Sequence, residues 1–426
     1  MVDDIWVVGD AFVDVQAFGV ERLPYRWDVD VECSSTALLP GGSAGNTARQ
    51  LHCLFLPDDK KTSKNSKTKS APPILAPIAE DSKDDAAPDA AAPVSPSPSS
   101  GSESPASAGS SGKPKPNAVF GSVRFLSAVG DDTLGRWYRD QLAKEGLDVS
   151  GLVLLPAVTT STCIILSGNR DRSMVSCYSS TDFEWKSSSL YKKMRFWLEG
   201  VPDSPKQSVS LEGSCTAARY VPKHVHIGGF FNLRGLQISE DFLKALASLG
   251  KRTTISVAPQ YDSSGKWTGL NEAMIKLLCF IDILFVNQNE YNEFAKKGFF
   301  KSSFCRHGML IVKTRGAMGC EIAVINREPG YEVEVQTLVS VPVLPPVQGD
   351  EKKTLVKVVD TTGAGDAFAA GFLYYWLRNR SGFDDFLHFL ELCAKSGNEV
   401  ALKSVQKRGA CEHPVAKTEL PEWIFY

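Results

Sequence analysis

Short apolar runs alternate with helix-like segments in the second half of the chain, and this rhythm restricts the fold more than any other feature. Strand-like runs at 225–228, 253–257 and 283–286 are separated by helix-like segments at 239–249 and 273–280. Strands and helices that alternate at this spacing favour a parallel sheet covered by helices on both faces. Ligands of such sheets bind beyond the carboxyl ends of the strands. We therefore expect an α/β fold whose site residues follow its strands.

A glycine-rich turn at residues 360–366, Asp-Thr-Thr-Gly-Ala-Gly-Asp, lies between a valine-rich strand predicted over 355–359 and an apolar helix predicted over 367–377. Backbone N–H groups at a helix start have no partner inside the helix, and they point outward with the positive end of its dipole, so they can bind phosphate. An acid beside phosphate repels it, so Asp366 has a purpose there only if it takes a proton from an attacking hydroxyl. The alternative is a tight turn in which Asp366 caps the helix.

A second glycine motif at residues 41–48, Gly-Gly-Ser-Ala-Gly-Asn-Thr-Ala, leads into a helix predicted over 49–56. Glycines allow the backbone to approach a ligand closely, and Asn46 offers a donor and acceptors to hydroxyl groups. Upstream, an apolar strand ends at Gly9, which places Asp10 and Asp14 at its carboxyl end. A glycine-rich helix start without a ligand is the alternative.

Composition and charge exclude several classes of function. The 426 residues are 43% hydrophobic, which is enough for a large core, and a net charge of −2 gives no general attraction to nucleic acid or membranes. Acids stand near the start where a signal peptide would carry lysines, and no apolar run approaches membrane-spanning length, so we expect a cytoplasmic protein. The ten cysteines form no Cys-x-x-Cys pair, which indicates neither a disulfide framework nor a zinc site.

Two segments carry little information about the fold. Residues 57–117 are rich in Lys, Ser, Pro, Ala and Asp and contain no aromatic residue, so they cannot bury enough apolar surface to offset their ordering entropy. We interpret them as a disordered, low-complexity insertion. Residues 186–219 are polar and irregular, with one short helix predicted at 191–198 and no chemistry assigned. Both are expected to interrupt a single domain that spans 1–426.

The motifs together resemble the signatures of the PfkB, or ribokinase-like, carbohydrate kinases. Besides the two glycine motifs, Gly-Asp-Asp-Thr-Leu-Gly at 130–135, Gly-Leu-Asp at 146–148 and Asn-Gln-Asn-Glu at 287–290 occur in the order typical of that family. The resemblance spans the chain outside the two low-information segments. It implies a three-layer α/β/α sandwich with a mostly parallel central sheet and a small β-sheet lid, formed by residues 11–40 and 155–182, that closes over the substrate.

The resemblance also implies roles for individual residues. Asp366 would be the catalytic base. The backbone amides that would bind the transferred phosphoryl group belong to Gly363, Ala364 and Gly365. The residues that would hold substrate hydroxyls are Asp10, Asp14, Gly42 and Asn46.

Nucleotide and metal roles follow from the same resemblance. The residues that would contact ATP are Thr314, Gly316, Gly319 and Asn398. Asn287 and Glu290 would bind Mg²⁺ and phosphate. Asp360 and Thr362 would belong to a monovalent-cation site, with K⁺ as the candidate ion, and their alternative role is hydrogen bonding at the helix entry. Arg315 either neutralises phosphate charge or lies in solvent.

The sequence therefore predicts a carbohydrate kinase that transfers the γ-phosphoryl group of ATP to a primary or anomeric hydroxyl of a small sugar. A nucleoside kinase of the same superfamily is one alternative, and an apolar, aromatic lid would favour it. A catalytically idle binding scaffold, with the insertion as its interaction tract, is the other. A homodimer formed through the lid is left open.

Overall fold

The computed structural model describes residues 5–21, 28, 30–56, 122–168, 172–182, 221–249, 253–301, 303–327, 333–343, 357–379 and 383–425. Its contacts divide the chain into one unit of residues 1–57 and 119–426, whose fold is given below, and a second of residues 58–118. The predicted insertions at 57–117 and 186–219, including the helix at 191–198, lie outside the described residues.

A nine-stranded sheet forms the centre of the fold, with the order β13-β12-β11-β10-β9-β8-β1-β4-β5. All neighbours from β11 to β5 pair in parallel, and β12 and β13 add an antiparallel edge. The strands are β1 (Ile5–Gly9), β4 (Val123–Gly130), β5 (Asp148–Leu155), β8 (His224–Gly228), β9 (Thr254–Ala258), β10 (Ile283–Asn287), β11 (Leu310–Thr314), β12 (Cys320–Asn326) and β13 (Glu334–Val341).

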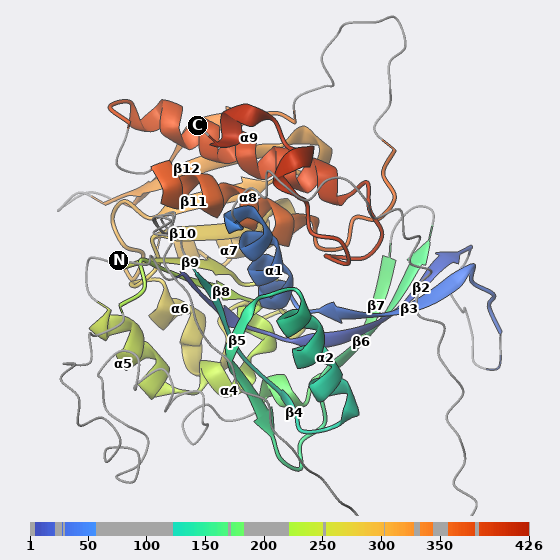
Figure 1. Ribbon diagram of the computed structural model, residues 1–426. Helices are drawn as coiled ribbons and strands as arrows, with labels where there is room; N and C mark the ends of the chain where they lie inside the picture. The colour runs from blue at the N-terminus through green and yellow to red at the C-terminus, as the bar shows by residue number, and fades with distance from the viewer. Residues whose placement is uncertain are drawn as a thin grey trace, which may run out of the picture. The chain divides into compact units, whose positions relative to one another are not determined.

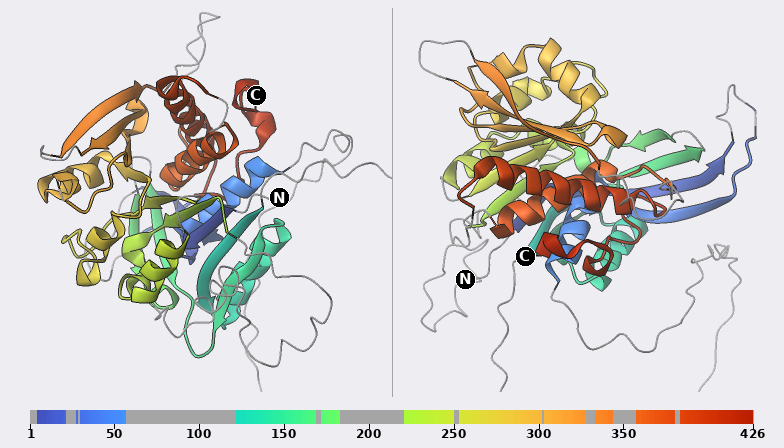
Figure 2. Two further views of the ribbon diagram at one scale, coloured as in Figure 1. Left: turned by 90° about the vertical axis from the view of Figure 1, so that its left-hand side faces the viewer. Right: turned by 90° about the horizontal axis from the view of Figure 1, so that it is seen from above.

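Helices cover both faces of this sheet (Figures 1 and 2). One face packs against α1 (Ser43–Phe55), α2 (Thr133–Lys144), α8 (Ala364–Asn379) and α9 (Phe386–Ser404). The other packs against α4 (Arg234–Gln237), α5 (Glu240–Ser248), α6 (Ala273–Leu277) and α7 (Gln288–Lys296). The three-layer α/β/α arrangement predicted from the strand and helix rhythm is confirmed.

Short 3₁₀ helices occur in the connections. They are η1 (Ser180–Asp182), η3 (Phe230–Asn232), η5 (Leu270–Glu272), η6 (Phe299–Lys301), η7 (Gly316–Met318), η8 (Lys417–Glu419) and η9 (Glu422–Phe425). None of the helices in the described ranges combines the length and apolar character that crossing a bilayer requires.

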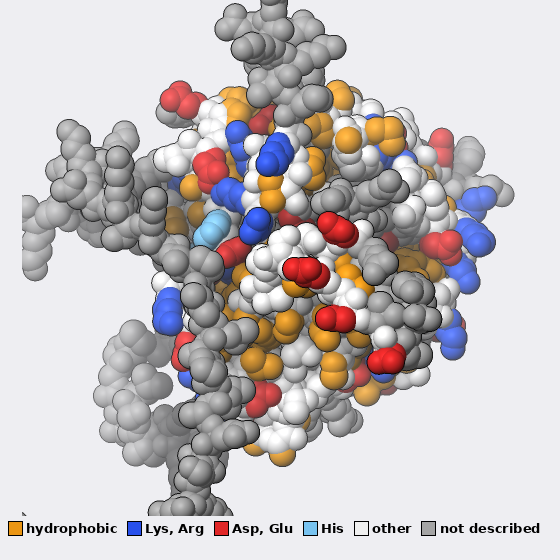
Figure 3. Space-filling model, turned by 90° about the vertical axis from the view of Figure 1, so that its right-hand side faces the viewer, with side chains coloured by type: hydrophobic (Ala, Val, Ile, Leu, Met, Phe, Trp, Pro, Cys, Tyr) orange, Lys and Arg blue, Asp and Glu red, His pale blue; other side chains and the backbone are white. Residues whose placement is uncertain are grey.

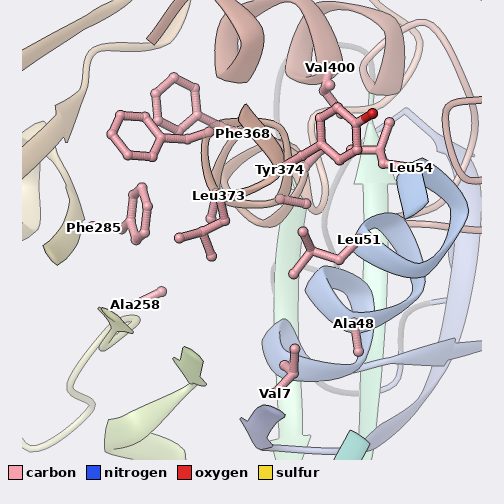
Figure 4. Packing of buried hydrophobic residues seen from close by; sticks show 14 of the residues in the cluster. Val7, Ala48, Leu51, Leu54, Ala258, Phe285, Phe368, Leu373, Tyr374 and Val400 are labelled. Atoms are coloured by element: carbon pink, nitrogen blue, oxygen red, sulfur yellow. The ribbon is translucent and has the colours of Figure 1, made fainter. Parts of the chain in front are cut away.

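Strand alternation divides the core into two layers. In β1, Ile5 and Val7 face one layer of helices, whereas Trp6 and Val8 face the other. On the first side, Leu51 of α1 lies in the same buried cluster as α8 and α9 (Figure 4). Burying a leucine side chain contributes about 1.5–3 kcal/mol. The packing therefore fixes the starts of α1 and α8 near the carboxyl ends of the strands.

A separate four-stranded sheet stands at one side of the molecule (Figure 1), and we call it the lid sheet. Its order is β3-β2-β6-β7, where β2 pairs antiparallel with β3 and parallel with β6, and β6 pairs antiparallel with β7. The strands are β2 (Phe12–Val20), β3 (Ser35–Gly41), β6 (Thr162–Gly168) and β7 (Arg172–Cys177). The small sheet that the family resemblance implied is present.

The strand predicted over 355–359 is wrong in its described part, because 357–359 form no strand. The backbone N–H of Val359 donates instead to the carbonyl of Val405, just after α9, at 2.7 Å. Val358 and Val359 are 57% and 44% exposed. Their apolar character suggested a buried strand, but they belong to a loop. Consequently the glycine turn connects this loop to α8, which begins at Ala364, three residues earlier than predicted.

Candidate active site

Two cavities adjoin at the carboxyl ends of the parallel strands. The strand cavity, about 450 Å³, is lined by the ends of β10 and β11 and by the start of α8. The lid cavity, about 460 Å³, is lined by the lid sheet and the start of α1. The described residues that line both cavities are Arg172, Gln260, Gly363 and Asp366. The site can therefore hold two ligands that meet at Asp366.

Asp366 lies in the first turn of α8 and is 7% exposed. Its Oδ1 accepts a hydrogen bond from Ser43 Oγ at 2.7 Å, and its Oδ2 accepts one from Asn46 Nδ2 at 3.0 Å. Gln260 Nε2 approaches Oδ1 at 3.3 Å. The carboxylate is thus held by side chains from α1 and from the segment after β9. Among the described contacts, it makes none of the hydrogen bonds of a helix cap.

Burial makes the acids at this junction harder to ionise than exposed ones. Burial raises the pKa of Asp366 to about 7, against the lowering effect of the hydrogen bonds from Asn46 and Ser43. Burial likewise raises the pKa of Asp10 to about 6. The pKa of Asp14 is raised well above its ordinary value by burial and by the neighbouring charges of Asp10 and Asp366. A carboxyl group with a pKa near neutrality is suited to accept a proton during a reaction.

The start of α1 is fixed by close backbone packing. Gly42 precedes the helix with a φ of 89°, and a Cβ there would lie 2.6 Å from the carbonyl oxygen of Asp10. Asp10 Oδ1 accepts a hydrogen bond from the N–H of Ala44 at 2.9 Å, and Asp10 Oδ2 accepts one from Asn232 Nδ2 at 2.8 Å. Asp10 therefore anchors α1 to β1 and is already hydrogen-bonded. Only glycine fits at position 42 without strain.

Two buried acceptors face the lid cavity without a donor. Asn46 is 5% exposed, and within the described residues its Oδ1 has no hydrogen-bond partner. Asp14 is 6% exposed and lines the same cavity, and no hydrogen-bond donor in the described part of the chain contacts its carboxylate. Buried acceptors left unpaired are costly. Their arrangement suits a ligand that brings hydroxyl groups.

The lid sheet gives this cavity an apolar wall. Phe12 and Tyr178 meet edge to face with ring centroids 5.6 Å apart. Cys163, Ile165 and Met174 line the same cavity. The lid side of the cavity thus combines these apolar and aromatic groups with the polar side chains of Asp14, Arg172 and Ser176. The side formed by the start of α1 and by Asp366 of α8 is polar.

Asn287 and Glu290 form a capping box at the start of α7, beside the strand cavity. Asn287 Oδ1 accepts hydrogen bonds from the N–H groups of Asn289 and Glu290, and Glu290 Oε2 accepts one from the N–H of Asn287 at 3.0 Å. No donor among the described residues contacts Glu290 Oε1. Burial raises the pKa of Glu290 to about 7, so a nearby cation would favour its ionised form.

These residues fit a Mg²⁺ ion held mainly by its other ligands. No three histidine, cysteine or acidic side chains in the described ranges are grouped to hold a metal. Mg²⁺ beside a nucleotide usually binds one or two carboxylates, water and phosphate oxygens. Glu290 can supply the carboxylate.

The predicted nucleotide residues divide into two groups. Thr314 and Gly316 line the strand cavity, whereas Gly319 and Asn398 do not. Asn398 Nδ2 donates to the carbonyls of Val341 and Pro342, both at 3.3 Å, and so holds the end of β13. A Cβ at Gly319 would lie 2.1 Å from the Val341 carbonyl oxygen. Packing therefore requires a glycine at position 319, and the ATP contact of Asn398 stays a prediction.

Asp360 and Thr362 make the helix-entry hydrogen bonds that were the alternative to a cation site. Asp360 Oδ1 accepts from the N–H and the hydroxyl of Thr362 at 2.9 and 2.7 Å. Asp360 Oδ2 accepts from Gln16 Nε2 at 2.7 Å and from the N–H of Gly409 at 3.1 Å. Both oxygens are occupied by protein donors. The monovalent cation therefore stays a prediction, and no step below depends on it.

Comparison with known proteins agrees with this geometry. The pfkB family of carbohydrate kinases matches residues 117–199 and 351–417, and the second range contains the glycine turn and Asp366. The chain is similar to the PfkB family over these two ranges. The crystal structure of an uncharacterized sugar kinase from Pyrococcus horikoshii in complex with ATP is similar, with a TM-score of 0.56 and 20% sequence identity over 98% of this chain and 96% of that one. At this identity the likeness concerns the fold.

Two relatives represent different substrate classes by name. An uncharacterized sugar kinase of Archaeoglobus fulgidus is 46% identical over 69 residues, which are 15% of this chain and 24% of that protein. A nucleoside kinase of Methanothermobacter thermautotrophicus is 26% identical over 291 residues, which are 67% of this chain and 73% of that protein. Sequence similarity therefore leaves the acceptor of this protein undecided.

Some residues of this site were not predicted from the sequence. Ser43 stood inside the quoted glycine motif but received no role. Gln260 follows β9 with a φ of 65°, which is strained for a residue with a side chain, and donates to Ser43 Oγ at 2.9 Å. Its position after a strand was the available signal. Arg172 begins the lid strand β7 and Tyr178 follows its end, and no local pattern indicates that they line the site.

Proposed function

We propose that this protein transfers the γ-phosphoryl group of ATP to a hydroxyl group of a sugar or of the sugar part of a nucleoside. The observation that carries the proposal is the place of Asp366, a buried carboxyl group with a pKa near 7 that lines both cavities. A general base must reach the hydroxyl proton and must stand where the two substrates meet. Asp366 would meet both requirements, because it lines both cavities.

The acceptor would occupy the lid cavity. Among the described residues, no donor contacts Asn46 Oδ1 or the carboxyl group of Asp14, and both side chains line this cavity, so they would bind hydroxyl groups and orient the sugar. Asn46 Nδ2 also holds Asp366 at 3.0 Å, which links the orientation of the acceptor to that of the base. Gly42 would support this arrangement because its backbone conformation sets the start of α1. Asp10 would act indirectly, by anchoring the same helix at the N–H of Ala44.

The transferred phosphoryl group would lie at the start of α8. The N–H groups of Gly363 and Gly365 face no described acceptor, while the N–H of Ala364 makes a long contact of 3.3 Å to the carbonyl of Thr361. A Cβ at Gly365 would meet no atom within 4 Å, so the backbone there is open to the strand cavity. These amides and the helix dipole favour negative charge. Mg²⁺, when bound near Glu290, would neutralise part of the phosphate charge.

The lid wall favours a nucleoside as the acceptor over a free sugar. A free sugar carries hydroxyl groups around its ring, and those that face Phe12, Ile165 and Met174 would lose hydrogen bonds to water without gaining others. Each such loss costs about 1–3 kcal/mol. A planar base can instead pack against the aromatic edge of Phe12 and Tyr178. The ribose hydroxyls would then face Asp14 and Asn46.

An acceptor screen tests the proposal. Release of ADP from Mg·ATP would be measured with pentoses, hexoses, ketoses, keto-deoxy acids and nucleosides, each with a blank that lacks acceptor. We expect acceptor-dependent ADP release, with kcat/KM at least tenfold higher for a nucleoside than for free ribose. A free sugar as the preferred acceptor would overturn the nucleoside choice and leave the kinase proposal intact. Absence of ADP release with every acceptor would favour the idle scaffold.

A further inference from the structure

Arg172 is the positively charged residue among those that line both cavities. It is the first residue of β7 and therefore belongs to the lid sheet, whereas Gly363 and Asp366 belong to the start of α8. The pairing of Ser167 with Arg172 places it at the end of the lid hairpin. The lid thus carries a cation to the point where the two substrates would meet.

A hydrogen bond to the glycine turn holds this arginine in place. Arg172 Nη1 donates to Thr361 Oγ1 at 2.7 Å, two residues before Gly363. The guanidinium group therefore lies beside the amides that start α8. Its charge also acts on Asp366, because it lowers the pKa of that carboxyl group while burial raises it. Arg172 is accordingly close to both the base and the anion-binding turn.

A cation at this junction would offset the negative charge that phosphate groups bring there. Asp10, Asp14 and Asp366 are buried around the lid cavity, and ATP would add further negative charge. Arg315 also lines the strand cavity, but its Nη1 is paired with Glu321 Oε1 at 2.6 Å and its Nη2 donates to Ser340 Oγ at 3.1 Å. Arg315 is therefore directed toward the β12–β13 edge, and its charge is already offset by Glu321. Arg172 is better placed to neutralise phosphate at the junction.

We propose that Arg172 is a further catalytic residue, which donates hydrogen bonds to the peripheral oxygens of the phosphoryl group during transfer. This inference rests on the kinase activity proposed above. In the step, the acceptor oxygen forms a bond to the γ-phosphorus while its proton passes to Asp366. The bond from the γ-phosphorus to the bridging oxygen breaks, and its electron pair leaves with ADP. Arg172 is not consumed, and it stabilises charge on the group in transit.

The position of Arg172 on β7 couples it to binding of the acceptor. Met174, two residues later in β7, lines the acceptor side of the lid cavity. An acceptor that packs against β7 therefore also fixes the strand that presents Arg172. Phosphoryl transfer to water, which cannot make that contact, would lack this support. We expect ATP hydrolysis without acceptor to depend much less on Arg172 than transfer does.

Three variants of Arg172 test its role, with the acceptor that the screen identifies as the probe. For Arg172→Ala we expect kcat to fall about 10²–10³-fold while the KM for the acceptor stays within about threefold, because the contact forms mainly in the transition state. Arg172→Lys keeps the charge but loses the planar guanidinium group, which can donate two parallel hydrogen bonds. We therefore expect kcat to fall about tenfold in this variant. Arg172→Gln, which keeps a donor of similar length, replaces the alanine variant if that one unfolds. The matched control is Arg139→Ala, which changes a half-buried arginine that pairs with its neighbour Asp140.

Added guanidinium ion separates a catalytic role from a structural one. In Arg172→Ala it should restore part of kcat, whereas it should have no such effect in the control variant or in Asp366→Asn. A kcat in Arg172→Ala within about threefold of the parent value would overturn the inference, and so would a loss confined to the KM for the acceptor. If the parent protein itself shows no acceptor-dependent ADP release, the proposed function fails and the role of Arg172 fails with it.

Discussion

Asp366 is a carboxyl group buried beside other acids, and the cost of ionising it there controls its chemistry. Its pKa of about 7 is set first by burial and is opposed by hydrogen bonds from Asn46 and Ser43. An acid with this pKa is a stronger base than an exposed aspartate and is still ionised in a large fraction of molecules at neutral pH. The same burial that makes the group costly to ionise makes it effective as a proton acceptor.

The pH dependence of turnover should follow this group. Only ionised Asp366 can accept the proton, so activity is present above its pKa and is lost as the pH falls. With saturating Mg·ATP, we expect kcat/KM for the acceptor to decrease about tenfold per pH unit below an apparent pKa of about 7 and to level off above it. The measurement is a profile of initial rates between about pH 5 and pH 9. A flat profile across that range would contradict the assignment of this base.

At the scale of single residues, the sequence indicated the chemistry of each motif but not the residues that its side chains contact in the fold. Asp366, Asn46 and Glu290 were singled out because each stands in a motif after a strand or at a helix start. Gln260 and Arg172 were missed because they reach the junction only through the tertiary fold. The hydrogen bonds that occupy both oxygens of Asp360 could not be foreseen either, since Gln16 and Gly409 are distant in sequence.

The element that fixes the site is α8, and its packing against α9 depends on small residues. A Cβ added at Gly371 would lie 2.7 Å from the carbonyl oxygen of Ser396 and 2.7 Å from Val400 Cγ2. Ser396 Oγ also donates to the carbonyl of Gly371 at 2.8 Å. The two helices therefore meet closely at this glycine.

Gly371→Ala should destabilise the protein. Overpacking a close contact costs about 1–3 kcal/mol, and the better helix propensity of alanine returns about 1 kcal/mol. We expect a net loss of up to about 2 kcal/mol in the free energy of unfolding, measured by denaturant titration. Gly365→Ala, in the same helix, is the control, because a Cβ added there would meet no atom within 4 Å. Equal stability of the two variants would refute this account of the α8–α9 contact.

Most helices and strands could be located from the sequence because their periodicity was clear. The prediction was wrong where apolar residues turned out to be exposed. The buried runs of β1, β8 and β10 were recognised as interior strands, and they are fully or almost fully buried. The valines before the glycine turn look the same in sequence but are exposed. Only the tertiary structure distinguishes the two cases, because exposure depends on which segment packs above the valines.

At the scale of the whole molecule, the lid sheet turns its second face outward. Val15, Ile164 and Val175 are neighbours on that face and are 39%, 47% and 64% exposed. Hydrophobic side chains are visible among acidic ones on the side of the molecule that carries the lid (Figure 3). An apolar sheet face of this kind could be covered by the same face of a second chain, as the open homodimer prediction requires.

The homodimer can be tested by light scattering coupled to size-exclusion chromatography. If the lid faces pair, the mass should be twice 46.4 kDa, and Ile164→Asp should reduce it to that of one chain. Met174→Asp is the matched control, because Met174 is 48% exposed but lies on the cavity side of the same sheet. A parent protein with the mass of one chain at high micromolar concentration would remove the dimer prediction and leave the site unaffected.

The most direct test of the account compares Asp366→Asn with the parent protein. Acceptor-dependent ADP release and the affinity for ATP would be measured side by side, with the exposed Asp140→Asn as control. Loss of the base should lower kcat about 10²–10⁴-fold while the Kd for ATP changes little, because asparagine keeps the volume but cannot take the proton. An Asp366→Asn variant that turns over at a rate near that of the parent would contradict the central claim.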